Sequence, residues 1–361
     1  MKEKEKQLFK ALCKFKDKEI DKELVEYSTP TVLGHLFFNR MQGAAYDVLK
    51  NNGLLGKVNR EFRNSLGSAY EQNVQKNFSF FKCVTMLNDI LAHCNCKVAM
   101  LKGAYLCAHY PNGCRTSNDI DLLVLPKDVT TIGTLLTNAG FKQGNIRNGV
   151  FIPATRAEII ESKMMRGETV PYIKEVDLPF MRFFEVDINF SLDYKNGNAD
   201  ALEEMLSKTI VKQEKDISIP TLSDVDFFIH LCAHLYKEAT TLPWIKMHRD
   251  MTMYKYCDIY MLLTEMSDEQ LVQIFERAKN LDMEKICAYA ILETMGLFDI
   301  DYAFAHCISI KALENDTDFC LKVISPKEKK TLIYQTPDVN ERFFMEARVN
   351  DLKEVVSDEK T

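Results

Sequence analysis

Two aspartates at alternate positions of an apolar segment constrain this chain more than any other feature. Residues 119–124 read DIDLLV, the pattern of a strand with one polar face. Because alternate residues of a strand point to the same face, Asp119 and Asp121 project together. Carboxylates that close repel each other unless a proton or a cation lies between them, and near neutral pH the usual ion is a hard divalent cation such as Mg²⁺. With Lys102-Gly103 at the end of the preceding apolar strand, the segment predicts a metal site beside a phosphate-binding turn.

A third acidic residue lies in a later apolar strand. Asp187 occurs in EVDINF, residues 185–190, where valine and isoleucine flank it. Two carboxylates from one strand and a third from a neighbouring strand can hold two Mg²⁺ or Mn²⁺ ions about 4 Å apart, as in-line phosphoryl or nucleotidyl transfer requires. The plainer alternative is a solvated strand edge with unrelated acids. The third acid and the upstream Lys-Gly pair together favour a metal site formed by Asp119, Asp121 and Asp187.

The residues around the paired aspartates suit a bound nucleotide. Lys102 and Gly103 precede a helix whose first backbone N–H groups and positive dipole end attract phosphate. Gly103 permits close approach to the backbone, and Lys102 adds a point charge. Arg115 and Ser117 come just before Asp119, near enough in sequence to contact a phosphate or to brace the metal ligands. The alternative for the Lys-Gly pair is an ordinary loop, and for the arginine an ordinary surface position.

Composition limits the class of protein. A chain of 361 residues with 46% hydrophobic residues can form two or three packed units. The net charge of -6 argues against a protein that coats nucleic acid, although it is compatible with a local basic groove. The eleven cysteines are an odd, scattered set, which indicates reduced thiols. No signal peptide and no apolar run near the roughly 20 residues of a membrane span is visible, so we expect a cytoplasmic protein without membrane association.

The pattern along the chain predicts an α+β fold, with a small mixed-sheet core flanked by N-terminal and C-terminal helical regions. The expected segments are 1–95 (helical), 96–220 (α/β core), 221–324 (helical) and 325–361 (tail). The predicted strands are Lys97–Leu101, Asp119–Leu125, Val170–Val176 and Arg182–Leu192. The predicted helices are Gln7–Phe15, Thr31–Lys50, Arg60–Cys94, Gly103–Tyr110, Lys127–Ala139, Val225–Glu238, Met251–Glu265, Asp268–Leu281 and Met283–Met295.

Three residues of the C-terminal helical region are candidates for a substrate cleft. His230 and His234 are one turn apart on a predicted helix, so they share a face. That spacing can bind zinc, but no further ligands occur at a telling distance. The sole tryptophan, Trp244, could stack on a base or a sugar. The alternatives are histidines packed in the core and a tryptophan that plugs a gap between helices.

The core motif resembles the nucleotidyltransferase superfamily with the polymerase-β-like fold. The resemblance rests on LKG, a short helix, R-x-S-x-D-I-D-L-L-V and a later apolar strand with an aspartate. More narrowly, the chain resembles a poorly characterised bacterial nucleotidyltransferase group with helices on both sides of the catalytic sheet. The segments YSTPTVLGHLFFNRM, FFIHLCAH and YCDIYMLL extend this resemblance over roughly Tyr27 to Glu265.

The resemblance implies roles for individual residues. Gly103 matches the glycine of the phosphate turn, Asp119 and Asp121 the paired metal ligands, and Asp187 the acid that activates the acceptor hydroxyl. One position departs from the superfamily pattern. The usual Gly-Ser or Gly-Gly pair is Gly103-Ala104 here, so this position offers no hydroxyl to the phosphate, and Lys102 is expected to compensate.

The expected reaction is transfer of an NMP group from an Mg-NTP to a hydroxyl or amine of an acceptor, with release of pyrophosphate. A small molecule such as an aminoglycoside-like sugar, a protein side chain and an RNA 3′ end all suit the scaffold, and the acidic net charge weighs against RNA. The substitution at Ala104 motivates one alternative, a catalytically inactive nucleotide-binding regulatory protein. A metal-dependent phosphohydrolase ranks below it, because histidines should then interleave with the acids and His109 alone lies nearby.

Overall fold

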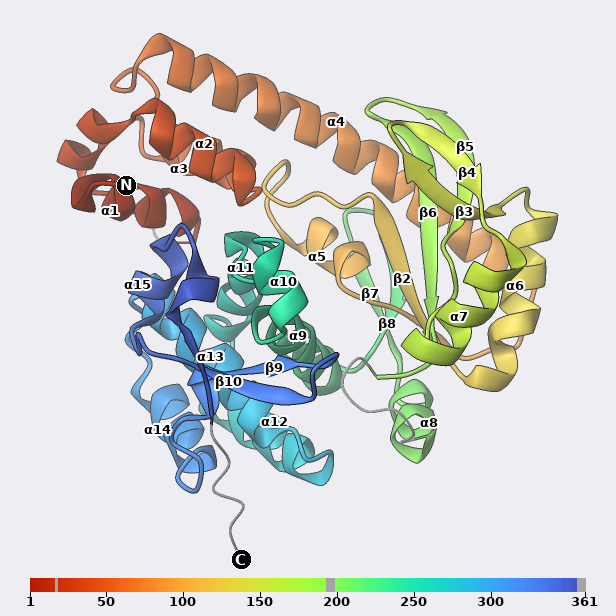
Figure 1. The fold of residues 1–361 in the computed structure, drawn as a ribbon. Helices are drawn as coiled ribbons and strands as arrows, with labels where there is room; N and C mark the ends of the chain where they lie inside the picture. The colour runs from red at the N-terminus through yellow and green to blue at the C-terminus, as the bar shows by residue number, and fades with distance from the viewer. Residues whose placement is uncertain (17–18, 193–198, 356–361) are drawn as a thin grey trace, which may run out of the picture. The chain divides into compact units, whose positions relative to one another are not determined.

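The chain packs into two units in the computed structural model, which describes residues 1–16, 19–192 and 199–355. One unit combines residues 1–40 with residues 228–361, and the other comprises residues 41–227. Figure 1 shows the helices and strands of both, and each unit is considered by itself below. Each of the four segments expected from the sequence is continuous in the chain, whereas one of these units combines residues from both ends of the chain.

A six-stranded mixed sheet forms the centre of the unit of residues 41–227. Its strand order is β1-β2-β6-β5-β3-β4, and only the β2–β6 pair is parallel among the described strands. A separate two-stranded hairpin, β7–β8, lies beside β1, where the Thr221 hydroxyl donates to the Met100 carbonyl over 2.6 Å. The strands are β1 (Val98–Met100), β2 (Asp119–Val124), β3 (Lys142–Arg147), β4 (Val150–Pro153), β5 (Tyr172–Leu178), β6 (Met181–Asn189), β7 (Ile210–Glu214) and β8 (Ile217–Thr221).

One face of this sheet is buried under helices. Ile120 and Leu122 of β2 and Val186 and Ile188 of β6 have no exposed surface, because strand alternation turns all four to the same side. Two helices, α4 and α6, contact β6 and β5 respectively. The helices of this unit are α3 (Gln42–Asn51), α4 (Arg60–Leu91), α5 (Gly103–His109), α6 (Val129–Asn138), α7 (Arg156–Arg166) and α8 (Ala199–Ser207), and α9 (Asp224–Ala239) begins in it.

The unit of residues 1–40 and 228–361 is mostly helical. Its helix α13 has buried residues around its whole circumference and contacts α11, α12, α14 and α15. A three-stranded sheet of order β11-β10-β9 packs on α10 through Leu242, Ile245, Val323 and Tyr334. The elements are α1 (Glu3–Cys13), α2 (Pro30–Phe38), α10 (Leu242–Lys246), α11 (Met253–Leu263), α12 (Asp268–Asn280), α13 (Glu284–Phe298), α14 (Ala303–Ala312), β9 (Lys322–Ser325), β10 (Lys330–Tyr334), α15 (Val339–Phe344) and β11 (Leu352–Glu354), with short 3₁₀ turns over Lys22–Tyr27, Phe319–Leu321 and Arg348–Asp351.

Residues expected to form a tail take part in this core. Phe343 and Phe344 of α15 pack on Phe9 of α1, with both ring centroids 5.9 Å from that of Phe9. Burial of aromatic side chains stabilises such contacts. Residues 325–355 therefore include two strands and a helix that belong to a packed unit.

The predicted α+β class, with a mixed sheet and flanking helices, is confirmed. The single helix expected over Thr31–Lys50 is wrong, because the structure has two helices there, α2 and α3. Arg40 adopts a φ of +57°, a left-handed conformation that cannot continue an α-helix. The Asn39 side-chain amide donates to the His35 carbonyl, so it satisfies one of the acceptors at the end of α2.

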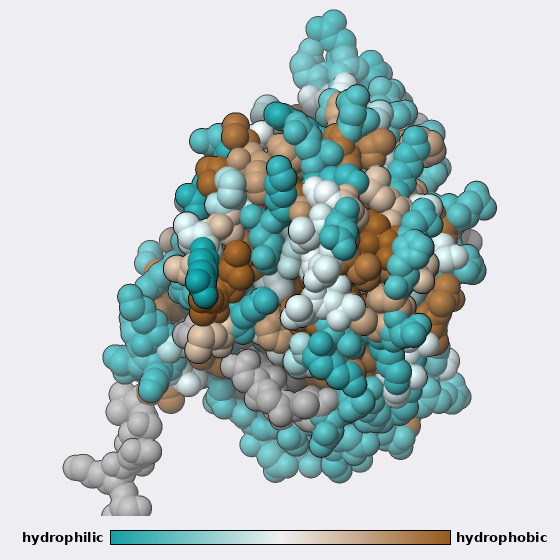
Figure 2. Space-filling view, turned by 90° about the vertical axis from the view of Figure 1, so that its right-hand side faces the viewer, coloured by the Kyte–Doolittle hydropathy of each residue, from teal (hydrophilic) through white to brown (hydrophobic). Residues whose placement is uncertain are grey.

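None of the described helices combines the length and the apolar character that a membrane span requires. Figure 2 shows hydrophobic side chains in separate patches between hydrophilic ones. Val150 and Ile152 of β4, the edge strand of the large sheet, are among the exposed hydrophobic residues. Part of this sheet edge therefore presents hydrophobic side chains to solvent.

A buried ion pair in the helical unit gives a test of the packing. Arg348 donates from Nε and Nη2 to the two carboxylate oxygens of Asp250 over 2.6 and 2.8 Å, and Asp250 has no exposed surface. We expect Arg348→Met to lower the free energy of unfolding by about 3 kcal/mol, because a buried carboxylate loses its partner. Arg182→Met, which removes an exposed pair with Glu175, should cost below about 1 kcal/mol. Urea unfolding measures both, and equal losses would contradict the assignment.

Candidate active site

The parallel pairing of β2 with β6 brings four carboxylates onto one face of the sheet. Asp121 lies directly opposite Asp187, and Asp119 lies directly opposite Glu185. Neighbouring strands are about 4.8 Å apart, so the four side chains start from the corners of a small quadrilateral. The structure thus brings together Asp119, Asp121 and Asp187, and it adds Glu185. The alternation of EVD in the sequence already implied that Glu185 and Asp187 share a face, but only the register shows that both face the aspartates of β2.

Polar side chains hold the two β2 aspartates. The Ser117 hydroxyl donates to Asp119 Oδ1 over 2.7 Å. The Lys102 ammonium lies 3.4 Å from Asp121 Oδ1, and the Asn189 side-chain amide also lies 3.4 Å from that oxygen. Lys102 therefore supplies the positive charge beside Asp121 in this structure, at the position where a divalent cation would compete with it.

The turn before α5 is built around close packing at Gly103. A Cβ atom at Gly103 would lie 2.6 Å from Ser117 Oγ and 2.7 Å from Ser117 Cβ, so only glycine leaves room for the serine that holds Asp119. Lys102, which begins the turn, has a φ of +41°. The expectation of free backbone N–H groups is wrong for Ala104, whose N–H donates to the Leu101 carbonyl over 3.3 Å. The Ala104 side chain is fully buried and does not line the turn's surface.

The alternative of an ordinary surface position is wrong for Arg115. Its side chain is buried, and Nη1 donates to the Thr116 carbonyl over 2.5 Å. This contact holds the guanidinium along the loop that leads into β2. Binding of a phosphate by Arg115 stays a prediction.

Burial and the neighbouring carboxylates raise the pKa of Asp187 and of Glu185. Burial, and then the negative charges of Asp121, Glu185, Asp119 and Glu168 in that order, raise the pKa of Asp187 well above its usual value. Burial, followed by Asp119 and Asp121, raises the pKa of Glu185 to about 7. Both shifts arise because negative charges are confined in a partly desolvated space. Such a site binds a proton or a cation more readily than a lone carboxylate does.

The donor set has the chemistry of a site for a hard divalent cation. Carboxylate oxygens are the ligands that Mg²⁺ and Mn²⁺ prefer. In the parts of the chain that the structure describes, no group of three or more His, Cys, Asp or Glu side chains is already arranged to hold a metal ion. The oxygens of Asp119 and Asp121 are directed at Ser117 and Lys102 instead. Binding would therefore require Lys102 to move and the carboxylates to turn.

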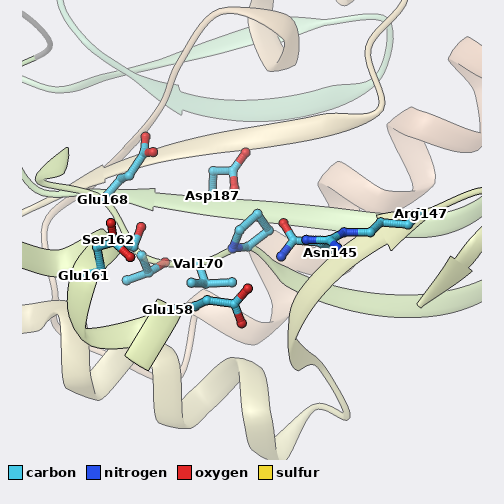
Figure 3. Close-up of a pocket in the computed structure, with 10 residues that line it drawn as sticks. Asn145, Arg147, Glu158, Glu161, Ser162, Glu168, Val170 and Asp187 are labelled. Atoms are coloured by element: carbon cyan, nitrogen blue, oxygen red, sulfur yellow. The ribbon is translucent and has the colours of Figure 1, made fainter. Parts of the chain in front are cut away.

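A cavity of about 370 Å³ opens beside Asp187, within the unit of residues 41–227. In the view of Figure 3, Glu158 and Glu161 of α7 lie below Asp187 and Glu168, with Val170 between Asp187 and Glu158. Asn145 and Arg147 of β3 line a further part of its wall. Sequence reasoning missed these residues, because short strand β3 and helix α7 carry no motif that marks a binding site.

The three proposed cleft residues lie in the other unit. His230 of α9 is buried, and His234 is half-buried with its Nε2 3.7 Å from Glu238 Oε1. Trp244 is half-buried in α10. A role of these three residues in substrate binding stays a prediction.

The pKa of Glu185, raised by burial and by the neighbouring carboxylates, predicts a pH-dependent stability. Between the usual pKa of 4.5 and the raised value of about 7, the folded state retains a proton on Glu185 that the unfolded state has released. The free energy of unfolding should therefore fall as the pH rises through this window. We expect Glu185→Gln to remove part of this loss and to be more stable above about pH 7 by on the order of 1 kcal/mol. Urea unfolding in EDTA across the window, with Glu203→Gln as control, tests this, and parallel curves for both variants would contradict it.

Comparison with known protein families supports the general class of activity that the motif predicts. A family model described as an uncharacterised nucleotidyltransferase matches residues 31–299, more than half of the chain and the whole of the β2–β6 site. No curated protein and no solved structure matches the chain. The family's description implies a nucleotide substrate. The chain therefore belongs to this family of uncharacterised nucleotidyltransferases.

Proposed function

We propose that the protein transfers an NMP group from an Mg-NTP, or a Mn-NTP, to a hydroxyl or amine of an acceptor and releases pyrophosphate. The observation that carries this proposal is the parallel register that sets Asp121 opposite Asp187 and Asp119 on the same face. Family membership supports the general class of reaction. In-line transfer needs acidic ligands on one side of the phosphorus and a base near the acceptor, and this face offers both.

Each residue has a distinct role in the proposal. Asp119 and Asp121 hold the divalent ion, which when bound neutralises charge on the triphosphate. Lys102, once released from Asp121, binds the β- and γ-phosphates beside Gly103 and Ser117. Arg115 supports the loop that carries Ser117.

The chemical step uses Asp187 as the proton acceptor. The acceptor oxygen or nitrogen forms a bond to the α-phosphorus with its own electron pair. The bond between the α-phosphorus and the oxygen that bridges to the β-phosphate breaks, and pyrophosphate leaves with the electron pair of that broken bond. The proton of the attacking group passes to Asp187, which the register holds beside the other carboxylates.

We also propose that the protein is cytoplasmic. The acceptor can be a small molecule, a protein side chain or an RNA 3′ end. Incubation with each α-³²P-labelled NTP, Mg²⁺ or Mn²⁺ and a cell extract separates these classes, because the label stays on the acceptor. If label appeared on no fraction under any condition, the transferase proposal would be wrong.

One observation favours a second candidate, a nucleotide-binding regulatory protein without catalysis. Position 104 has no hydroxyl, and the Ala104 N–H donates within the turn to the Leu101 carbonyl. A protein of this kind would bind a nucleotide, with no pyrophosphate release in any acceptor fraction. The labelling experiment therefore distinguishes the two functions.

The proposed metal ligand Asp121 and the proposed base Asp187 give the first prediction from this proposal. Asp121→Asn and Asp187→Asn should each lower transfer by roughly 100-fold or more, because one loses a ligand charge and the other the base. Asp187→Asn should unfold no more easily than the wild type, since it removes a buried charge that its neighbours repel. Pyrophosphate release and thermal unfolding measure the two effects, with Glu203→Gln as the control. Intact turnover in both variants would exclude these roles.

The glycine of the turn, Gly103, gives the second prediction from this proposal. In Gly103→Ala the new Cβ must displace Ser117, which then loses its hydrogen bond to Asp119, and we expect transfer to fall by roughly 10-fold or more. Gly34→Ala is a matched control, because nothing lies within 4 Å of its new Cβ in α2. That variant should keep full activity and gain up to about 1 kcal/mol of stability. Equal activities of the two variants would show that the packing of Gly103 on Ser117 is not required.

A further inference from the structure

The carboxylate face of β6 ends at an asparagine. Asn189 is the last residue of the strand and lies two residues after Asp187, so its side chain points to the same face as the proposed base. In the parallel pair with β2, Asn189 lies directly opposite Leu123, whose side chain is fully buried. Because the side chain of Leu123 offers no polar atom, the amide of Asn189 turns diagonally across the pair, toward Asp121.

The amide nitrogen of Asn189 contacts both strands of the site. Its Nδ2 lies 3.4 Å from Asp121 Oδ1 and 3.5 Å from the main-chain carbonyl oxygen of Asp187. An amide nitrogen carries two protons, so it can donate to both oxygens at once. Asn189 therefore connects the proposed metal ligand on β2 to the backbone that carries the proposed base on β6.

The backbone at Asn189 is held from both sides. On one side it belongs to the ladder with β2. On the other side it forms a β-bridge with Glu168, and the N–H of Phe190 donates to the carbonyl of Gly167 over 2.9 Å. The amide therefore reaches Asp121 from a fixed starting point, as a group that orients another side chain must.

The two donors at Asp121 differ in charge. Lys102 Nζ and Asn189 Nδ2 each lie 3.4 Å from Asp121 Oδ1. In the proposed reaction Lys102 leaves this oxygen for the phosphates, and a divalent ion takes its place beside the carboxylate. An ammonium group close to the ion would repel it, whereas a neutral amide would not. Asn189 can therefore keep its contact with Asp121 while the ion is bound.

We propose that Asn189 is a positioning residue of the divalent-ion site, which holds the Asp121 carboxylate in orientation once Lys102 has moved. The inference rests on the proposed transferase function and adds a residue to its site. Hydrogen bonds to an ionised carboxylate are stronger than those between neutral groups. Removal of a group that orients a metal ligand typically lowers metal affinity by roughly 10–100-fold. The same amide fixes Asp121 relative to the backbone of Asp187, so the ion and the base keep their spacing.

Binding of Mn²⁺ alone to the nucleotide-free full chain tests this inference without any turnover. Electron paramagnetic resonance measures the free ion during a titration. Asn189→Leu keeps the size of the side chain and removes the donor, so it should weaken Mn²⁺ binding by roughly 10-fold, and Asn189→Ala should act in the same direction. Asn51→Ala is the matched control, because it removes another hydrogen bond from asparagine to aspartate, from Asn51 Nδ2 to Asp47 Oδ2 over 2.9 Å on α3. It should leave the Mn²⁺ affinity unchanged.

The metal dependence of transfer separates positioning from a loss of folded protein. In Asn189→Leu, the Mg²⁺ concentration for half-maximal transfer should rise by roughly 10-fold, whereas the rate at saturating Mg²⁺ should fall by a smaller factor. A merely structural role of Asn189 would lower the thermal midpoint and the maximal rate and would leave the half-saturating Mg²⁺ concentration unchanged.

The outcomes separate this inference from the proposed function. Unchanged Mn²⁺ affinity in both Asn189 variants, with a clear loss in Asp121→Asn, would overturn the inference and leave the proposed function intact. Equal losses in Asn189→Leu and Asn51→Ala would also overturn it. No binding of Mn²⁺ by the wild type would refute both the inference and the proposed metal ligands. A selective loss in Asn189→Leu, combined with no transfer of label to any acceptor, would support the positioning role and refute the transferase proposal instead.

Discussion

In the parallel pair of β2 with β6, like charges face one another across two strands, and every other feature of the site depends on that pairing. Asp119 and Asp121 lie opposite Glu185 and Asp187, and their mutual repulsion opposes the association of the strands. The opposite face of the same strands is fully buried. Burial of each large aliphatic side chain contributes roughly 1.5–3 kcal/mol, which offsets the repulsion. A slip of one residue would turn the acids into the core, so the hydrophobic face also fixes the register.

The surrounding residues convert this repulsion into a site of defined geometry. Ser117 holds Asp119, and Lys102 lies beside Asp121 as a resident positive charge. The packing of Ser117 against Gly103 links the turn before α5 to the first aspartate. In the proposed function, a nucleotide with its divalent ion would replace Lys102 beside Asp121, and Lys102 would then bind the phosphates.

Much of the fold follows from local patterns. The long helix α4, the strand–helix–strand order of β1, α5 and β2, and the strand that carries Asp187 were all predicted near their observed bounds. The break between α2 and α3 was missed, since no glycine or proline marks Asn39 or Arg40, and the interruption lies in a left-handed residue within an apolar run. Strands β3, β4 and β9–β11 were missed because they are short and partly exposed, so alternation of polar and apolar residues is weak in them.

The sequence by itself determined that Asp119 and Asp121 share a face, and that Glu185 and Asp187 do, because the two-residue period of a strand is a property of the local backbone. Only the tertiary structure decided that the two pairs meet, since strand order and register depend on which hydrophobic faces bury one another. The cavity has the same origin. Its walls come from β3, α7 and the segment before β5. No sequence pattern relates these segments, and they become neighbours only when the sheet forms.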